Sequence, residues 1–513
     1  MVPFLTVPLR GLLLGLVLVG GCRQTTSAGD LPLHWPSQPA PPLRGANPQV
    51  WVALADRLPG PAAGAGTPEL NLELRAATGR LRLRDGAGLD KQSDRFEIRW
   101  LREPLPQPFV LERQVIGPFP SYESAAEQAR LWRLKGASPV LARPGEWEVW
   151  APLASPPPDG PVRQERQEHQ QRWRPALVSK EAAAPLPLQG PVRLEAPGGL
   201  LWQGVRYPGP FRLQADAYGS WTLVEQLPME TYLAGVVPHE IGAGAPPAAL
   251  GAQAVLARTW AVANQRRFQV DGYHLCADTQ CQVYSNPTQL GSELRGALQR
   301  SAGQVLTWKG EPVAGVYSAS NGGVAAGFEE GWRGQALPYL RAFVDGPPAQ
   351  QKRFPLPLAG EAALGKLLRE GAELYGQGHP RYRWQRRLRA AELTALTAPE
   401  AIGPIKDLVV AQRGPSGRVQ ELVLVGAAGE LRLQRDQIRR RLRMLPSTLF
   451  LLAPEGPGVW LLEGGGFGHG AGLSQAGAID LAQRGWGSDR ILQHYFPGSS
   501  LRPLKTLQPQ GSP

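Results

Sequence analysis

The chain has 513 residues, 42% of them hydrophobic, which excludes a wholly disordered protein and allows about three domains of ordinary size. Its 61 glycines and 52 prolines predict many turns and some linkers. The net charge of +12 favours an acidic partner such as anionic lipid or a cell-wall polymer, but the basic residues are dense only at residues 439–443 and no nucleic-acid-binding signature accompanies them, so no nucleic-acid partner is expected.

The N-terminal residues have the features of a bacterial export signal. A single Arg10 precedes an uncharged apolar stretch at residues 11–21, which is too short to span a bilayer and predicts a signal peptide over residues 1–21. Two glycines directly before Cys22 form the pattern of a lipobox, which implies lipidation of that thiol. An ordinary cleaved signal peptide is the alternative. In either case we expect an extracytoplasmic protein of the cell envelope, held to a membrane if Cys22 carries lipid.

The next residues predict a tether and a small N-terminal module. Residues 22–47 are rich in Pro, Ser and Gly without periodicity, as in a flexible tether. Residues 48–152 alternate between apolar and polar and then predict a strand, a helix and a strand pair. In that helix Ser121 is a candidate N-cap and Gly136 a candidate stop. The pattern resembles a SPOR domain, which implies binding to glycan strands of peptidoglycan; a plain α+β spacer is the alternative.

A linker and a long β-rich unit follow. Residues 153–187 combine a proline-rich stretch with a charged, glutamine-rich one, which is typical of a domain boundary. Residues 188–505 predict an α+β domain in which strands predominate. Its strands are predicted at residues 192–196, 211–218, 221–227, 304–310, 408–413, 419–426 and 430–434, and its helices at residues 246–268, 476–485 and 488–496. In the first helix Leu256, Trp260 and Ala263 share one face, which predicts a core face.

A glycine-rich run at residues 464–478 (GGGFGHGAGLSQAGA) contains His469 as its single ionisable side chain. Glycine lets a backbone approach a ligand closely and adopt positive φ. A linker or a phosphate-binding loop is the alternative, but the run continues into a predicted helix and lacks the P-loop and dinucleotide-binding patterns. We therefore predict that His469, with Ser474 and Gln475 just beyond it, faces a polar substrate.

Glu240 is the strongest candidate for acid–base chemistry. It lies between an apolar, strand-like piece at residues 235–237 and the helix predicted to start near Pro246. Catalytic groups concentrate on such connections, and burial would raise the pKa of the carboxyl toward that of a general acid. The alternative is an ordinary acidic residue that complements the dipole at a helix N-terminus.

Several segments together resemble one known family. They are LPMETYLAGVVPHEI (227–241), AALGAQAVLARTWAVAN (248–264), YSASNGG (317–323), LPYLRAFVD (337–345), RGPSGRV (413–419) and the glycine-rich run with the helices after it. This order is similar to that of the stage II sporulation protein D/LytB family, whose characterised members are peptidoglycan lytic transglycosylases. The resemblance implies that Glu240 is the catalytic acid. It also implies that one glutamate suffices, because the 6-hydroxyl of the sugar attacks instead of water.

The resemblance further implies a substrate-binding set around Glu240. We expect His469, Ser474 and Gln475 on one side of the glycan, with side chains of the YSASNGG segment opposite them. The complete expected set is His469, Ser474, Gln475, Ser318, Ser320, Asn321 and Arg258. Many relatives carry histidine where this chain has Tyr317, so its substrate preference could differ from theirs.

If Cys22 carries lipid, Cys276 and Cys281 remain, within HLCADTQC at residues 274–281. Four intervening residues allow a local disulfide, and a zinc site with His274 is the alternative, although a fourth ligand is not evident. Some relatives bind zinc through a histidine just before the second cysteine, where this chain has Gln280. The disulfide is therefore favoured, and no cofactor is certain.

Three functions remain open on the sequence alone. The first is an envelope-anchored lytic transglycosylase that cleaves the bond from N-acetylmuramic acid to N-acetylglucosamine and leaves 1,6-anhydro ends. The second is a non-catalytic module that binds peptidoglycan or stimulates a cell-wall amidase, which would then be its partner. The third is a polyanion binder driven by charge, whose affinity would collapse with salt.

Overall fold

The structure is a computed structural model that describes residues 31–60, 71–179, 184–288, 290–371 and 373–507. It is an α+β protein rich in strands, with 36% strand and 24% helix, which confirms the predicted fold class. The predicted signal peptide and Cys22 lie outside the described residues. Within the described part of the chain, no helix combines the length and apolar character needed to cross a membrane.

One large sheet contains strands from both sides of the predicted linker. Its order is β15 (Leu275–Cys276), β1 (Gln49–Leu58), β14 (Trp221–Pro228), β13 (Phe211–Ala215), β10 (Val192–Glu195), β3 (Leu81–Arg84) and β4 (Asp90–Ser93). Strand β1 pairs antiparallel with β14 along most of its length. Residues 48–152 and residues 188–505 therefore share a sheet and a core, and the predicted separation between them is wrong.

The second large sheet explains why the predicted linker is also wrong. It contains β12 (Val205–Tyr207), β11 (Leu200–Trp202), β2 (Asn71–Ala76), β5 (Arg95–Phe119), β7 (Trp147–Ala151), β6 (Val140–Ala142), β8 (Arg163–Val178) and β9 (Leu186–Pro187). Strand β8, inside the predicted linker, pairs antiparallel with β5. Its charged residues form cross-strand ion pairs, such as Arg172 with Glu103 at 2.6 Å. Because this strand is mostly exposed to solvent, its charged, glutamine-rich composition resembles that of a linker.

The described part of the predicted tether is also packed. Leu43 is buried in the main core, and the Trp35 ring lies 4.4 Å from that of Phe109 on β5. Residues 31–47 therefore form a strap across the sheets rather than a free tether.

The predicted strand, helix and strand pair are confirmed as the end of β5, helix α1 (Tyr122–Leu134), and strands β6 and β7. The Ser121 side chain accepts a hydrogen bond from the Ser124 N–H at 3.2 Å, and Gly136 has φ of 90° just after the helix. Both serine hydroxyls donate to Asp436, at the start of α9 (Asp436–Arg441), so the N-terminal module is anchored to a distant part of the chain. The resemblance to a SPOR domain stays a prediction.

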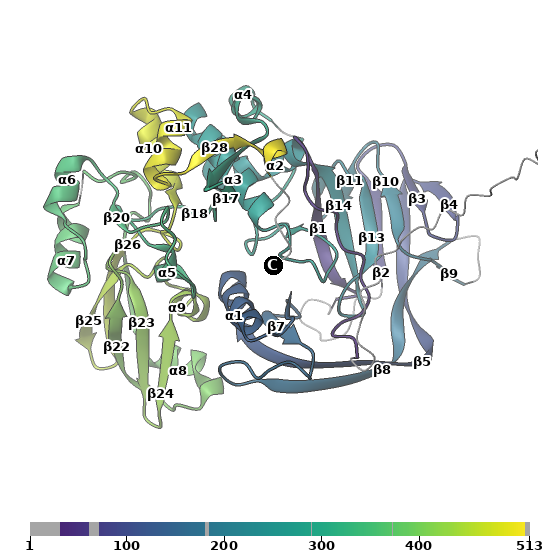
Figure 1. The fold of residues 1–513 in the computed structure, drawn as a ribbon, viewed down its shortest axis with the longest axis horizontal. Helices are drawn as coiled ribbons and strands as arrows, with labels where there is room; N and C mark the ends of the chain where they lie inside the picture. Colours follow the sequence, from purple (N-terminus) through teal and green to yellow (C-terminus); the bar gives the residue numbers. More distant parts are fainter. Residues whose placement is uncertain (1–30, 61–70, 180–183, 289, 372, 508–513) are drawn as a thin grey trace, which may run out of the picture.

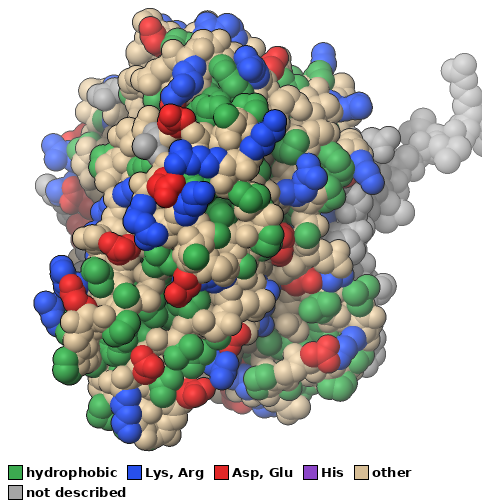
Figure 2. Space-filling model, turned by 90° about the vertical axis from the view of Figure 1, so that its left-hand side faces the viewer, with side chains coloured by type: hydrophobic (Ala, Val, Ile, Leu, Met, Phe, Trp, Pro, Cys, Tyr) green, Lys and Arg blue, Asp and Glu red, His purple; other side chains and the backbone are tan. Residues whose placement is uncertain are grey.

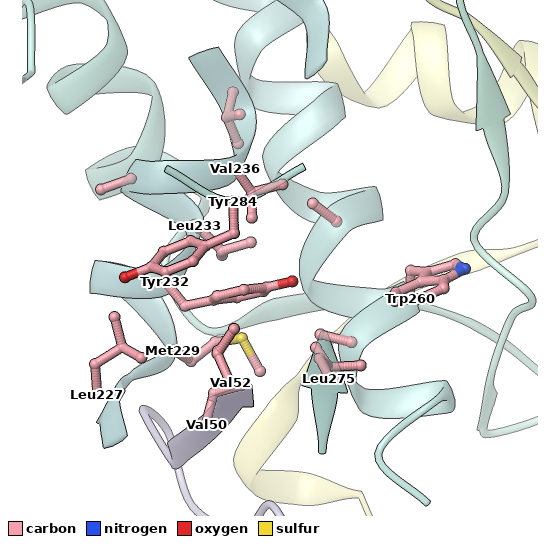
Figure 3. Packing of buried hydrophobic residues seen from close by; sticks show 14 of the residues in the cluster. Val50, Val52, Leu227, Met229, Tyr232, Leu233, Val236, Trp260, Leu275 and Tyr284 are labelled. Carbon is pink, nitrogen blue, oxygen red and sulfur yellow. The ribbon is translucent and has the colours of Figure 1, made fainter. Parts of the chain in front are cut away.

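The central helices pack around α3, and α2 joins them to the first sheet. They are α2 (Met229–Val237), α3 (Pro247–Ala263), α4 (Ser292–Ser301), α10 (Gln475–Gln483) and α11 (Ser488–Tyr495). The three helices predicted from the sequence are confirmed, but residues 235–237 belong to α2 and not to a strand. Helix α3 is buried on nearly every side, so the prediction of one core face was too narrow. Figure 3 shows the packing where α2 and β1 meet, around Tyr232 and Tyr284.

The remaining elements are smaller. Three sheets have three strands each: β17 (Glu311–Pro312), β16 (Gln304–Trp308) and β28 (Ser500–Pro503); β21 (Arg383–Arg389), β26 (Val459–Gly465) and β25 (Phe450–Gly456); and β22 (Ile405–Arg413), β23 (Val419–Gly426) and β24 (Glu430–Gln434). Two further sheets are strand pairs, β18 (Tyr317–Ser318) with β27 (Leu473–Ser474) and β19 (Val324–Ala325) with β20 (Phe343–Val344). The short helices are α5 (Phe328–Gly331), α6 (Pro348–Arg353), α7 (Glu361–Glu370) and α8 (Ala390–Leu396). Figure 1 shows the large sheets on the right, the β5–β8 ribbon beneath them, and most of these smaller elements in a lobe on the left.

The dense basic segment at residues 439–443 is largely engaged within the protein. Arg440 pairs with Glu146, Arg441 pairs with Glu400 at 2.5 Å, and burial lowers the pKa of Arg439. Figure 2 shows basic side chains interspersed with acidic and hydrophobic ones on the face that it presents. The positive charge is therefore not gathered at this segment into a free polyanion-binding surface.

A buried carboxyl makes the stability of this core depend on pH. Glu225 on β14 is fully buried; it accepts hydrogen bonds from the Gly209 N–H at 2.8 Å and the Tyr284 hydroxyl at 2.7 Å. Burial raises the pKa of Glu225 from 4.5 to about 7. The folded state therefore holds this proton more tightly than the unfolded state, and its stabilising effect is complete below pH 4.5 and lost as the pH rises through 7.

We expect Glu225→Gln to remove this dependence. Between pH 4.5 and 8 the wild type should lose on the order of 3 kcal/mol of unfolding free energy that the variant keeps. Denaturant unfolding across this pH range measures the difference. Glu311→Gln, an exposed glutamate on β17, is the matched control and should follow the wild type. Parallel pH profiles for the wild type and Glu225→Gln would contradict the prediction.

Candidate active site

Glu240 lies in a single π-helical turn, Pro238–Gly242, that connects α2 to α3. Such turns are rare and occur often at functional sites. The turn ends at Gly242, whose φ is 89°, and the chain then enters α3. His239 is exposed and its Nδ1 hydrogen-bonds to the Gly235 carbonyl at 2.8 Å, whereas the Glu240 side chain is half-buried. The turn thus directs the two neighbouring ionisable side chains into different environments.

The Glu240 carboxyl is desolvated but supplied with hydrogen-bond donors. Burial raises its pKa; the Val283 N–H at 2.8 Å from Oε1 and the side chains of Tyr317 and Gln475 favour the ionised form and oppose the rise. The pKa remains above the usual value for glutamate. A carboxyl in this state can hold a proton at higher pH than an ordinary glutamate and still be stabilised after releasing it.

A chain of buried hydrogen bonds orients the Tyr317 hydroxyl. The Tyr232 hydroxyl donates to Gln282 Oε1 at 3.0 Å, and Gln282 Nε2 donates to the Tyr317 oxygen at 3.0 Å. Because the Tyr317 oxygen already accepts from Gln282, its own proton is free to point to Glu240. The order of donors therefore makes Tyr317 a fixed donor to the carboxylate.

Gln475 reaches the Glu240 carboxyl from a segment more than 200 residues further along the chain. It is the first residue of α10, and its Nε2 lies 3.4 Å from Oε1 of Gln253, a fully buried residue of α3. Its side chain also hydrogen-bonds to the Glu240 carboxyl, and the expected contact of Gln475 with a substrate stays a prediction.

The glycine-rich run serves backbone packing more than ligand approach. A Cβ on Gly470 would lie 2.0 Å from Nη2 of Arg418, and one on Gly472 would lie 2.1 Å from the Val316 carbonyl oxygen. Both glycines also have positive φ. The run is pressed against protein atoms at these positions, which corrects the expectation of a loop that is open to a ligand.

His469 forms hydrogen bonds within the protein. Its Nδ1 accepts from the Ala471 N–H at 3.1 Å, its ring lies 4.7 Å from that of Trp332, and its other nitrogen hydrogen-bonds to the Tyr317 carbonyl. Burial, with the nearby charge of Arg439, lowers its pKa to about 3. A neutral His469 therefore holds the strand that carries Tyr317, and its expected contact with a substrate stays a prediction.

The other expected binding residues lie together but are mostly engaged within the protein. Strands β18 and β27 pair in parallel, with Ser318 beside Ser474, so the two segments do face each other as predicted. Ser474 caps α10 by accepting from the Gly477 N–H at 3.2 Å, Ser320 accepts from the Gly322 N–H at 3.3 Å, and Asn321 donates to Asp345 at 2.6 Å. Only the Ser318 hydroxyl in this group is without a hydrogen-bond partner.

Arg258 does not belong to the site. Its guanidinium is fully buried in α3, where it makes two hydrogen bonds to Glu230, at 2.8 and 2.6 Å, and one to the Gln304 carbonyl at 2.9 Å. The prediction of substrate binding is wrong because this arginine ties α2, α3 and β16 together inside the protein.

Cys276 and Cys281 form a disulfide, with their Cα atoms 5.7 Å apart. His274 accepts from the Trp51 N–H at 2.9 Å and its other nitrogen hydrogen-bonds to the Pro41 carbonyl at 2.7 Å. Both ring nitrogens are thus occupied, and burial lowers the pKa of His274 to about 4. Among the described residues no group of three His, Cys, Asp or Glu side chains is arranged to hold a metal ion. These three residues do not fit the alternative zinc site.

Sequence reasoning missed three polar residues around Glu240. Tyr317 attracted notice only as a departure from relatives, while Gln253 and Gln282 attracted none. Each had a local signal, since Gln253 is an amide within an alanine-rich, apolar helix and Gln282 directly follows the second cysteine. A lone amide in such surroundings needs a buried partner.

Comparisons with known proteins cover the same region of the chain. Residues 217–308 match the family model described as "Stage II sporulation protein", and residues 326–472 match a domain of unknown function, DUF8618. The chain is 29% identical to stage II sporulation protein D of Bacillus amyloliquefaciens over 54% of this chain and 74% of that protein, and 26% identical to the same protein of Bacillus subtilis over 54% and 75%. It is 27% identical to an amidase enhancer of Bacillus subtilis over 52% of this chain and 40% of that protein.

We expect Gly470→Ala to destabilise the protein by more than about 1 kcal/mol, because the added methyl group meets Arg418 at a position of positive φ. Thermal or denaturant unfolding measures the change. Gly378→Ala is the matched control, since Gly378 is exposed and a Cβ there meets no atom within 4 Å. A Gly470→Ala protein as stable as the control would refute the packing role.

Proposed function

Because the chain belongs to the stage II sporulation protein D family, which is linked to cell-wall hydrolysis, we propose that it is a peptidoglycan lytic transglycosylase with Glu240 as its catalytic acid and base. The observation that carries the proposal is the state of this carboxyl. Burial raises its pKa, while three donors, including the fixed Tyr317 hydroxyl, stabilise its ionised form.

The proposed reaction uses the same carboxyl twice. Protonated Glu240 gives its proton to the oxygen that links N-acetylmuramic acid to N-acetylglucosamine, and the bond from that oxygen to C1 of the muramyl residue breaks. The 6-hydroxyl of the same muramyl residue then attacks C1 and gives its proton to the Glu240 carboxylate. The products are a free 4-hydroxyl on N-acetylglucosamine and a 1,6-anhydro-muramyl end, and no water is consumed.

The surroundings of Glu240 support a one-carboxyl mechanism. Hydrolases that use water place two carboxyl groups about 5 to 9.5 Å apart across the scissile bond. Besides burial, the main influences on the pKa of Glu240 within the described chain are a backbone N–H, a tyrosine, a glutamine and a histidine, and none of them is a carboxyl group. An attacking group that belongs to the substrate removes the need for a second carboxyl, and Tyr317 and Gln475 hold the carboxylate between the two proton transfers.

An envelope location fits this substrate. The relatives support a function related to the cell wall, and we propose that the signal peptide exports the chain and that lipid on Cys22 holds it at the membrane. Replacing Cys22 with serine should release the protein from the membrane fraction; continued sedimentation with membranes would contradict lipid anchoring.

The amidase enhancer among the relatives favours a second candidate function, a non-catalytic module that binds peptidoglycan and stimulates a cell-wall amidase. This function requires no acid at residue 240. The two functions therefore differ in whether the Glu240 carboxyl is needed.

We expect Glu240→Gln to abolish cleavage of purified, peptide-free glycan strands. Loss of the acid should lower the rate by at least about 100-fold, because general acid catalysis typically contributes that much. Mass spectrometry of the products measures 1,6-anhydro-muramyl ends. Glu293→Gln, an exposed glutamate in the first turn of α4, is the matched control and should cleave like the wild type.

Two outcomes would refute different parts of the proposal. If the wild type forms no 1,6-anhydro ends but stimulates an amidase, and Glu240→Gln does so equally well, the second function holds. If Glu240→Gln cleaves like the wild type, another residue is the acid.

The pH dependence of cleavage tests the role of Tyr317. Because Glu240 must begin protonated, kcat/KM should fall as the pH rises through its pKa. Tyr317→Phe removes a donor to the ionised form, so the falling limb should move to higher pH and the maximal rate should drop. Tyr339→Phe, which alters a hydroxyl that accepts from the Ala314 N–H, is the control and should leave the profile in place. A limb that stays in place or moves to lower pH would exclude the assigned role.

A further inference from the structure

A cavity of about 880 Å³ opens between the N-terminal strap, the β5–β8 ribbon and β13. Neither Glu240 nor any residue that hydrogen-bonds to it is among the lining residues. Four aromatic side chains line the cavity, namely Trp35, Phe109, Trp173 and Trp221. A cavity of this size, lined by aromatic rings together with polar side chains, is typical of a site for a small ligand.

An arginine with no acidic partner lies in the wall of this cavity. Arg212 is 7% exposed; its Nη2 donates to the Gln38 side chain and its guanidinium lies 5.1 Å from the centre of the Trp51 ring. Within the described residues no carboxylate comes within 4 Å of it, and its Nε has no hydrogen-bond partner. A desolvated guanidinium without a counter-charge is costly, and it has the geometry to bind a carboxylate.

The other charged groups of the cavity are already satisfied. Arg172 and Arg174 both pair with Glu103 across the two strands. The carboxylate of Asp216 accepts from the Ser220 hydroxyl at 2.7 Å and from backbone N–H groups of residues 218 and 220. Arg172 and Arg174 share one carboxylate, whereas Arg212 is the arginine of the lining that has none.

Two further buried polar atoms of the lining residues also lack partners. They are the indole N–H of Trp35 and Oε1 of Gln214, whose Nε2 donates to the Gly272 carbonyl at 2.8 Å. Gln214 is 2% exposed and is two residues from Arg212 on β13, so the two side chains project from the same face of the strand. Buried polar atoms are normally hydrogen-bonded, and three orphans on one cavity indicate a polar ligand.

From this combination we propose that the cavity binds a saccharide that carries a carboxylate. Aromatic rings suit the apolar face of a pyranose, while the Trp35 N–H and the Gln214 oxygen match a donor and an acceptor on its polar rim. Arg212 binds the carboxylate. The site is separate from Glu240 and does not depend on the proposed cleavage there; it would hold an acidic glycan away from the reacting bond.

Two monosaccharides that differ by one acidic substituent test the proposal on the full chain. N-acetylmuramic acid carries a lactyl carboxylate, and N-acetylglucosamine does not. Calorimetric titration and ligand-observed NMR should show that N-acetylmuramic acid binds at least about tenfold more tightly. Arg212→Gln should remove that preference, and Arg212→Lys should retain part of it.

Two more variants keep the test informative if Arg212→Gln folds poorly. Phe109→Leu, which removes a half-buried ring and keeps an apolar side chain, should weaken both sugars about equally. Glu293→Gln, an exposed glutamate on α4, should bind both like the wild type. These titrations measure no cleavage, so a failure of the proposed cleavage remains distinguishable from a failure of this site.

Three results would overturn the proposal. The first is equal affinity of the wild type for both sugars, or no binding of either. The second is an unchanged preference in Arg212→Gln. The third is tighter binding of the dipeptide D-alanyl-D-alanine than of N-acetylmuramic acid, which would make the cavity a site for a peptide carboxylate.

Discussion

The parallel pairing of β18 with β27 is the constraint on which the candidate active site depends. It brings together two segments more than 150 residues apart, with Tyr317 beside Leu473 and Ser318 beside Ser474. The pairing delivers Tyr317 and Gln475 to the carboxyl of Glu240, which arrives separately on the turn after α2. The tight glycine-rich backbone, the neutral His469 and the cap at Ser474 all serve to hold this pairing in place.

The sequence predicts the elements of the fold far better than their assembly. Local signals such as the Ser121 cap and the proline at the start of α3 act over a few residues, and the structure confirms them. The β-branched Val236 and Val237 instead lie in a helix, because burial between α3 and the first sheet outweighs their intrinsic preference. The pairing of β1 with β14 crosses more than 160 residues, and no local pattern reports it.

In the candidate site, too, the sequence indicates some of the residues but not the contacts that surround them. Glu240 and Gln475 could be singled out from motifs, but the resemblance gives a residue its role and not its neighbours. Whether a histidine touches a substrate or supports a strand is set by contacts such as that of His469 with Trp332. Arg258 was misassigned for the same reason, because the sequence does not distinguish an arginine in a buried ion pair from one that binds a ligand.

The position of the disulfide has a consequence for when the carboxyl acquires its surroundings. The two residues after Cys281 are the ones that reach the site, since Gln282 orients the Tyr317 hydroxyl and the Val283 N–H binds Glu240 directly. The covalent link to Cys276 therefore restrains the backbone that supplies both hydrogen bonds. A chain still in a reducing cytoplasm lacks this restraint, so the redox state of the compartment is coupled to the order of the acid's environment.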